Sequence, residues 1–62
     1  MDAPSLVERM IAALDGKPID NRGDRLDAYS EAGVSLAGYS DDEWRNADAQ
    51  AHLHELSKRI TR

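Results

Sequence analysis

The spacing of apolar residues near the start of the chain is the feature that most constrains its fold. These residues recur at three- and four-residue steps, which places them on one side of an α-helix: Leu6, Val7, Met10, Ile11 and Leu14. Ser5 and Glu8 have the spacing of a capping box, in which each side chain bonds the backbone of the other residue. Gly16 suits the left-handed turn after a helix, and Pro18 prevents its continuation. We predict a helix over residues 6–15.

A second capping box, formed by Ser40 and Glu43, stands inside the stretch YSDDEW at residues 39–44. Tyr39, before the cap, is spaced to pack on Trp44 as a hydrophobic staple, and the acids suit the positive end of the helix dipole. From Asp41 the chain runs to its end without Gly or Pro, and three cations lie near that end: Lys58, Arg59 and Arg62. This is the longest predicted helix, and an exposed binding role for Trp44 is the alternative to the staple.

A shorter helix is predicted between these two. Asp24 is the expected cap after the turn at residues 17–23, and the helix runs through Ala32 to Gly33. Residues 34–39 alternate like a strand, but no second strand exists to pair with them, so we expect a hydrophobic loop. The predicted fold is all-α: one domain over residues 1–62, with two short helices and a longer C-terminal helix.

The apolar residues of the third helix lie on two faces. At about 100° per residue, Trp44, Ala47 and Ala51 lie nearly opposite a second set, which is Ala49, Leu53, Leu56 and Ile60. The second set packs either on the first helix or on another chain. We predict a protein interface there, and the next candidates for contact are Tyr39, Trp44 and Arg45. Three pairs spaced for ionic contact along this helix are Asp41–Arg45, Asp48–His52 and Glu55–Arg59.

The charge of the chain argues against nucleic acid as a partner. Twelve Asp and Glu against eight Lys and Arg give a net charge of −4, whereas nucleic-acid binders normally carry a basic patch. A helix-turn-helix regulator is the alternative function, since that motif is usually built from three short helices. Two features oppose it: the third helix begins with three acidic residues, and the connection at residues 33–40 is longer than the usual turn of this motif. The chain has no Cys, no signal-like start and no run of about 20 apolar residues, so we expect a cytoplasmic protein without membrane contact.

Catalytic and metal-binding motifs are missing from the sequence. His52 and His54 are two residues apart, so on a helix they point in nearly opposite directions and cannot share an ion. Residues 20–24 lack the calcium-loop pattern, because the Gly is at the wrong position and Arg22 replaces a ligand. No phosphate loop or nucleophile elbow appears, and so short a chain has little room to enclose a substrate. We expect no enzymatic activity, cofactor, metal or small-molecule substrate.

Because the sequence argues against nucleic-acid binding, catalysis and metal binding, we predict a small helical interaction module that occupies a surface of a larger protein. That partner could be a transcriptional regulator, and a homodimer is also open. A regulatory or inhibitory protein of the antiactivator, antitoxin, phage or mobile-element accessory type has these properties.

Overall fold

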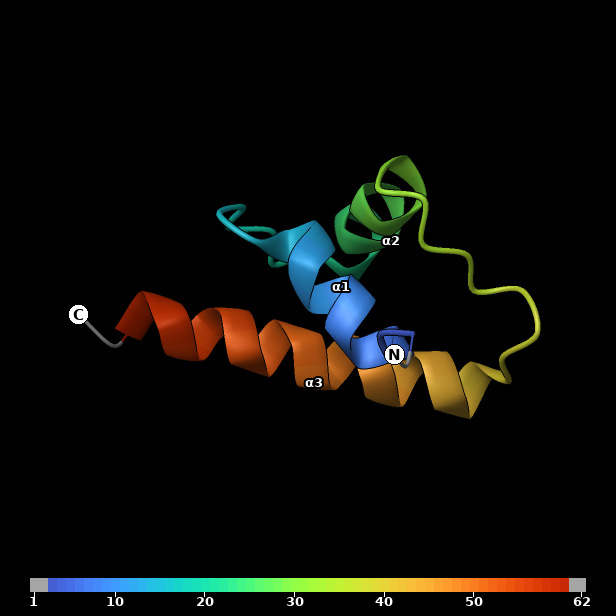
Figure 1. The fold of residues 1–62 in the computed structure, drawn as a ribbon. Helices are drawn as coiled ribbons and strands as arrows, with labels where there is room; N and C mark the ends of the chain where they lie inside the picture. Colours follow the sequence, from blue (N-terminus) through green and yellow to red (C-terminus); the bar gives the residue numbers. More distant parts are fainter. Residues whose placement is uncertain (1–2, 61–62) are drawn as a thin grey trace.

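The computed structural model describes residues 3–60, and within this range the chain forms three α-helices and no strand (Figure 1). The helices are α1 (Leu6–Leu14), α2 (Arg22–Glu31) and α3 (Asp41–Ile60). The prediction of an all-α chain with two short helices and a longer third helix is confirmed, as is the loop at residues 34–39. Arg62, predicted to lie near the end of the third helix, is outside the described residues.

Both predicted capping boxes are present. Ser5 Oγ accepts from the Glu8 N–H at 3.2 Å, and Glu8 Oε1 accepts from the Ser5 N–H at 3.4 Å. At the start of α3, Ser40 Oγ accepts from the Glu43 N–H at 3.2 Å, and the Glu43 carboxylate accepts from the Ser40 N–H at 2.9 Å. Because these bonds satisfy N–H groups that have no partner within the helix, each box determines where its helix begins.

The predicted start of α2 was wrong. The N-cap is Asn21, whose Oδ1 accepts from the N–H groups of Gly23 at 2.8 Å and Asp24 at 3.3 Å. Asp24 therefore lies inside the first turn, where its charge still suits the helix dipole. The end of α2 is as predicted: Gly33 takes a φ of +81°, and the Val34 N–H donates to the Tyr29 carbonyl at 2.8 Å.

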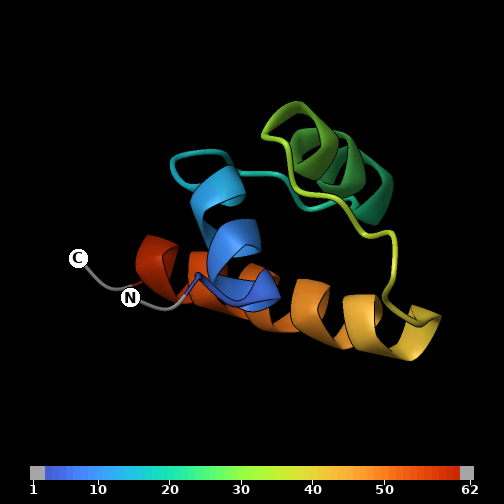
Figure 2. The same ribbon diagram turned by 45° about the vertical axis from the view of Figure 1, so that its right-hand side comes forward.

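The two short helices lie on the same side of α3. α1 packs across α3 and also against α2, and both views place α2 on the same side of α3 as α1 but farther from α3 (Figures 1 and 2). No Cα atom of α2 comes within 8 Å of a Cα atom of α3. The other side of α3 consequently has no helix of this chain against it among the described residues.

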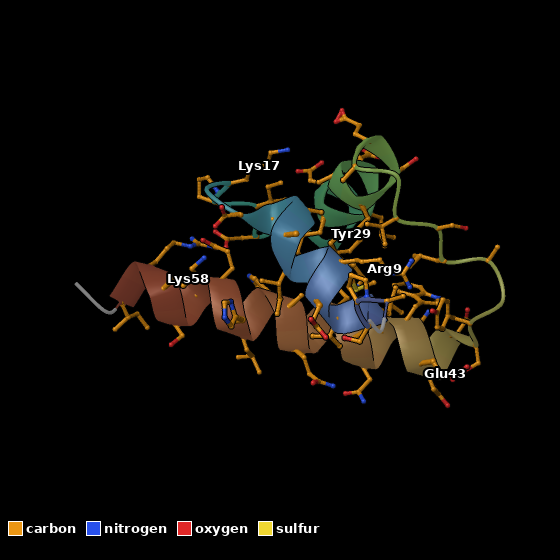
Figure 3. The ribbon with its side chains drawn as sticks, in the orientation of Figure 1. Arg9, Lys17, Tyr29, Glu43 and Lys58 are labelled. Carbon is orange, nitrogen blue, oxygen red and sulfur yellow. The ribbon has the colours of Figure 1, made fainter. Side chains whose placement is uncertain are left out.

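The core is small and rich in alanine. Its largest fully buried apolar side chains are Met10, Leu14 and Tyr29 (Figure 3 labels Tyr29). Where α1 meets α3, the buried residues include Ala13, Ala47 and Ala51, and such small side chains let the two helices approach closely. The interior accordingly uses the Trp44, Ala47 and Ala51 side of α3 rather than its leucine side.

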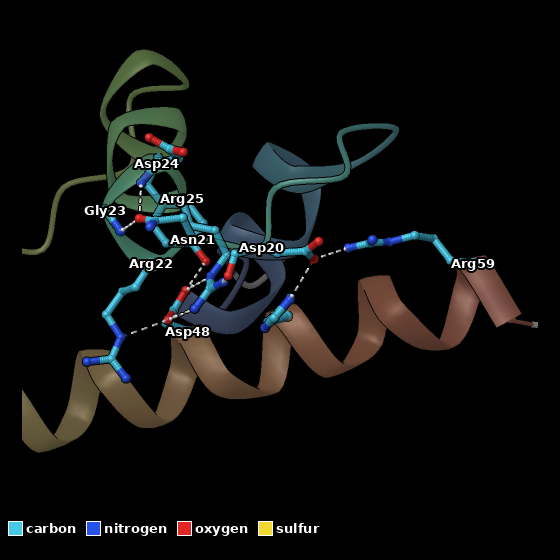
Figure 4. Close-up of polar contacts among 10 residues, drawn as sticks. Asp20, Asn21, Arg22, Gly23, Asp24, Arg25, Asp48 and Arg59 are labelled. Carbon is cyan, nitrogen blue, oxygen red and sulfur yellow. Dashed lines mark hydrogen bonds and ion pairs between the residues drawn. The ribbon is translucent and has the colours of Figure 1, made fainter.

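The connection between α1 and α2 is attached to the C-terminal half of α3 by ion pairs. Lys58 Nζ lies 2.9 Å from an Asp15 carboxylate oxygen, and Arg59 lies 2.8 Å from Asp20 (Figures 3 and 4). His52 also contacts Asp20, at 3.4 Å. The predicted pairing of His52 with Asp48 was wrong, because Asp48 points into the interior instead. None of the described helices is long and apolar enough to cross a membrane.

Candidate functional site

A buried polar network joins α2 to α3. Asp48 of α3 is 1% exposed and accepts two parallel hydrogen bonds from Arg25, at 2.8 and 2.9 Å (Figure 4). The Tyr29 hydroxyl donates to the same carboxylate at 2.5 Å, and Arg22 lies 3.8 Å away at the exposed edge. We call these four residues the Asp48 network. Since the backbones of α2 and α3 stay apart, the network is the direct polar link between them.

The charges of the network stabilise one another. Burial alone would raise the pKa of Asp48, but the hydrogen bonds from Arg25 and Tyr29 outweigh burial and hold that pKa below its ordinary value. Burial raises the pKa of Tyr29, and the neighbouring carboxylate of Asp48 raises it further, so Tyr29 stays a neutral donor. Asp48 is therefore an anion whose neutralising partner is the Arg25 guanidinium.

The network has a structural role. A catalytic acid or base needs an open approach for a substrate, whereas Asp48 and Arg25 are both almost completely buried. Within residues 3–60 every buried side-chain nitrogen and oxygen has a hydrogen-bond partner. The same range contains no group of three His, Cys, Asp or Glu that could hold a metal ion. The Arg25 guanidinium donates to Asp48 and to the Asp20 carbonyl, and its bonds to Asp48 hold α2 to α3.

The predicted interface residues of α3 lie on its outer side. We call this set the outer stripe: Ala49, Leu53, Leu56 and Ile60. Leu53 is 65% exposed and Ile60 is 80% exposed, while Ala49 is exposed and Leu56 is half-buried. Because α1 and α2 occupy the opposite side, the chain leaves this apolar row open to solvent (Figure 1).

The other predicted contact residues surround the start of α3. The Arg45 guanidinium lies 5.5 Å from the centre of the half-buried Trp44 ring, and the Trp44 indole N–H donates to Asp41 at 3.2 Å. Tyr39 is 37% exposed, and its hydroxyl accepts from Arg9 at 3.1 Å.

Arg45 and Tyr39 relate differently to the outer stripe. Arg45 precedes Ala49 by one helical turn and continues the outer stripe. Tyr39 instead lines a shallow groove between α1 and α3, together with Val7, Asn46 and Gln50. The structure therefore brings Trp44 and Arg45 together, and it places Tyr39 on the α1 side of the helix.

The Asp48 network was missed from the sequence, although a signal for it exists. Asp48 follows Trp44 by four residues and precedes Ala51 by three, so it belongs to their face of the helix. Arg25 likewise stands three and four residues before Ala28 and Tyr29. Opposite charges at inward positions of two helices suggest a buried pair.

Comparisons of this chain with protein-family models, with curated proteins and with solved structures found no match.

Proposed function

We propose that this protein is a small non-enzymatic interaction module that binds a larger protein through the outer stripe of α3. The observation that carries the proposal is the exposure of Leu53 and Ile60, at 65% and 80%, beside an exposed Ala49. A row of mostly exposed apolar side chains on a regular helix is typical of a surface that a partner covers. Leucines at helical spacing also fit the apolar groove of a larger protein.

The energetics favour such docking. Burying Leu53 and Ile60 against a partner would contribute roughly 1–2 kcal/mol for each side chain. The helix is already formed and held by its capping box and by α1, so binding does not have to order the backbone. Arg45 beside the outer stripe adds a residue type that is common among the strongest contacts of interfaces.

Binding of this kind acts by occupying a surface of the target. An antiactivator of a transcriptional regulator, an antitoxin or an accessory protein of a phage or mobile element can act by occupying a surface of its target. We propose that this chain is a regulatory or inhibitory partner of this class. The proposal gives no polar residue of the chain a catalytic role.

The test is affinity capture from the native host with three forms of the protein: wild type, Leu53→Asp and His54→Asp. His54 is an exposed neighbour of Leu53 that lies outside the outer stripe. The His54→Asp control therefore introduces the same aspartate charge at a position away from the outer stripe. We expect wild type and His54→Asp to retain the same protein, identified by mass spectrometry, and Leu53→Asp to lose it while keeping its helical circular dichroism. Capture that is unaffected by Leu53→Asp would contradict the proposal.

A further inference from the structure

The two halves of α3 are held to the rest of the chain in different ways. In the N-terminal half the buried residues include Ala47 and Ala51, which belong to the core. Beyond Ala51, Glu55 is the only buried residue in the described part of the helix. Leu56 is half-buried and Ile60 is exposed, and neither is among the residues packed against the core. The last turns of α3 therefore receive little stabilisation from apolar burial.

Ion pairs with the connection between α1 and α2 hold these turns instead. Lys58 Nζ lies 2.9 Å from an Asp15 carboxylate oxygen (Figure 3 labels Lys58). Arg59 Nη2 at 2.8 Å and His52 Nε2 at 3.4 Å contact one oxygen of Asp20 (Figure 4). We call these five residues the ion-pair cluster. Its partners are 32 to 43 positions apart in the sequence, so the cluster is a tertiary contact rather than a property of the helix alone.

The carboxylates of the cluster are ionised and in contact with water. The hydrogen bond from Lys58 holds the pKa of Asp15 below its ordinary value, and that from Arg59 does the same for the pKa of Asp20. The Asp15 and Asp20 side chains are nevertheless 68% and 66% exposed. Because salt screens attractions between exposed charges, the strength of the cluster depends on ionic strength.

The segment that the cluster holds carries two members of the outer stripe. Leu56 and Ile60 lie in the same turns of α3 as Lys58 and Arg59. Arg59 also donates to Glu55 at 2.6 Å, but that pair lies within α3 and does not tie the helix to the rest of the chain. Helix ends with few tertiary contacts open most easily. Order in the C-terminal half of the outer stripe consequently depends on the cluster.

We propose that the ion-pair cluster is a salt-sensitive device that orders the last turns of α3 and thereby controls the C-terminal half of the outer stripe. While the pairs are formed, Leu56 and Ile60 are presented on a fixed helix, and a partner does not have to order them. When salt screens the pairs, the partner has to order these turns as it binds. The effect on binding rests on the proposed function, whereas the ordering is a property of the free chain.

Amide hydrogen exchange of the free protein, followed by NMR, tests the ordering. Asp15→Asn/Asp20→Asn, which we call the neutralised variant, removes both carboxylates without changing any residue of α3. We expect exchange at residues 56–60 to become about three- to ten-fold faster at low salt. The control is Asp27→Asn/Glu31→Gln, which removes the same charge from exposed acids of α2 that form no ion pair among the described residues. This control should exchange like the wild type.

Salt tests the same point without a substitution. The screening length falls from about 30 Å at 0.01 M to about 3 Å at 1 M salt. Over this range we expect exchange at residues 56–60 of the wild type to approach that of the neutralised variant, which itself responds less. Equal exchange in the two proteins at low salt, or a difference that persists at 1 M, would overturn the inference.

Leu6→Ala shows whether the end of α3 opens by itself. Leu6 is buried and lines the groove between α1 and α3 beside Ala47, away from the ion-pair cluster. We expect this variant to speed exchange at residues 44–51 and to leave residues 56–60 nearly unchanged. Equal acceleration of both segments would mean that the end opens only when the whole chain unfolds, and it would overturn the inference.

Affinity capture at one fixed salt concentration separates failure of this inference from failure of the proposed function. The probe is the protein that the wild type captures from the native host. We expect the neutralised variant to retain less of it than the Asp27→Asn/Glu31→Gln control does. Equal retention by these two variants would refute control of the outer stripe by the cluster. Capture that does not depend on Leu53, together with the expected exchange results, would refute only the proposed function.

Discussion

At the scale of single residues, Asp48 determines how α2 is held. Its carboxylate receives both the Arg25 guanidinium and the Tyr29 hydroxyl in a site with almost no water access. Removing one member of such a pair leaves the other charge buried without a partner, which costs more than the pair itself contributes.

Replacement of Asp48 by Asn keeps the shape of the side chain and removes its charge. We expect the free energy of unfolding to fall by about 3 kcal/mol, because Arg25 loses its neutralising partner. Asp27→Asn, an exposed change of the same kind, should stay within about 0.5 kcal/mol of the wild type. Urea denaturation followed by circular dichroism measures both, and equal losses in the two variants would show that the buried pair is not stabilising.

The low pKa of Asp48 also predicts how stability depends on pH. A carboxyl whose pKa in the folded chain lies below its unfolded value, ordinarily 3.8, stabilises the fold fully above that value. This contribution is lost as the pH falls through the lower, folded pKa. We expect the urea midpoint of the wild type to decrease below about pH 4 and that of Asp48→Asn to decrease less over the same range. Parallel pH profiles for the two proteins would exclude Asp48 as a source of the acid sensitivity.

At the scale of elements, local chemistry predicted two helix starts and missed one. The capping boxes at Ser5 and Ser40 were recognised because each uses residues three apart in the sequence. The start of α2 was misplaced because Asn21 and Asp24 are both good caps, and Gly23 between them made an earlier start look unfavourable. The network that joins α2 to α3 needs residues 23 positions apart, so only the tertiary arrangement pairs them.

Loss of the second capping box should weaken α3 at its start. Ser40→Ala removes the oxygen that accepts from the Glu43 N–H, and we expect a loss of about 0.5–2 kcal/mol. Ser57→Ala, an exposed substitution within the same helix, should be neutral or slightly stabilising, because Ala is the better helix former. Thermal melts compare the two variants. Equal melting temperatures for Ser40→Ala and the wild type would mean that the box does not stabilise the start of α3.

At the scale of the whole molecule, the two short helices gather on one side of α3 and leave the outer stripe on the other side open to solvent. The two-faced pattern of α3 indicated from the sequence that this helix needs two covers. Both faces carry apolar residues of similar spacing, and from the sequence we predicted that the outer stripe is the face left for another chain. The structure covers the alanine face, whose small side chains allow α1 to pack closely.

The charge distribution of the molecule also predicts its behaviour toward DNA. With a net charge of −4 and three acids in the first turn of α3, we expect no sequence-specific duplex binding at physiological salt. A gel-shift titration against a pool of genomic fragments is the measurement. A specific complex at nanomolar concentration would instead support the helix-turn-helix alternative.

The central claim is that the outer stripe lies outside the core and serves contacts with another chain. Its most direct test is the unfolding free energy of the double variant Leu53→Asp/Ile60→Asp, measured by urea denaturation at a concentration too low for self-association. Both side chains are mostly exposed, at 65% and 80%, so we expect a value within about 1 kcal/mol of the wild type. A loss of several kcal/mol, or an unfolded variant, would place the outer stripe in the core and contradict the account.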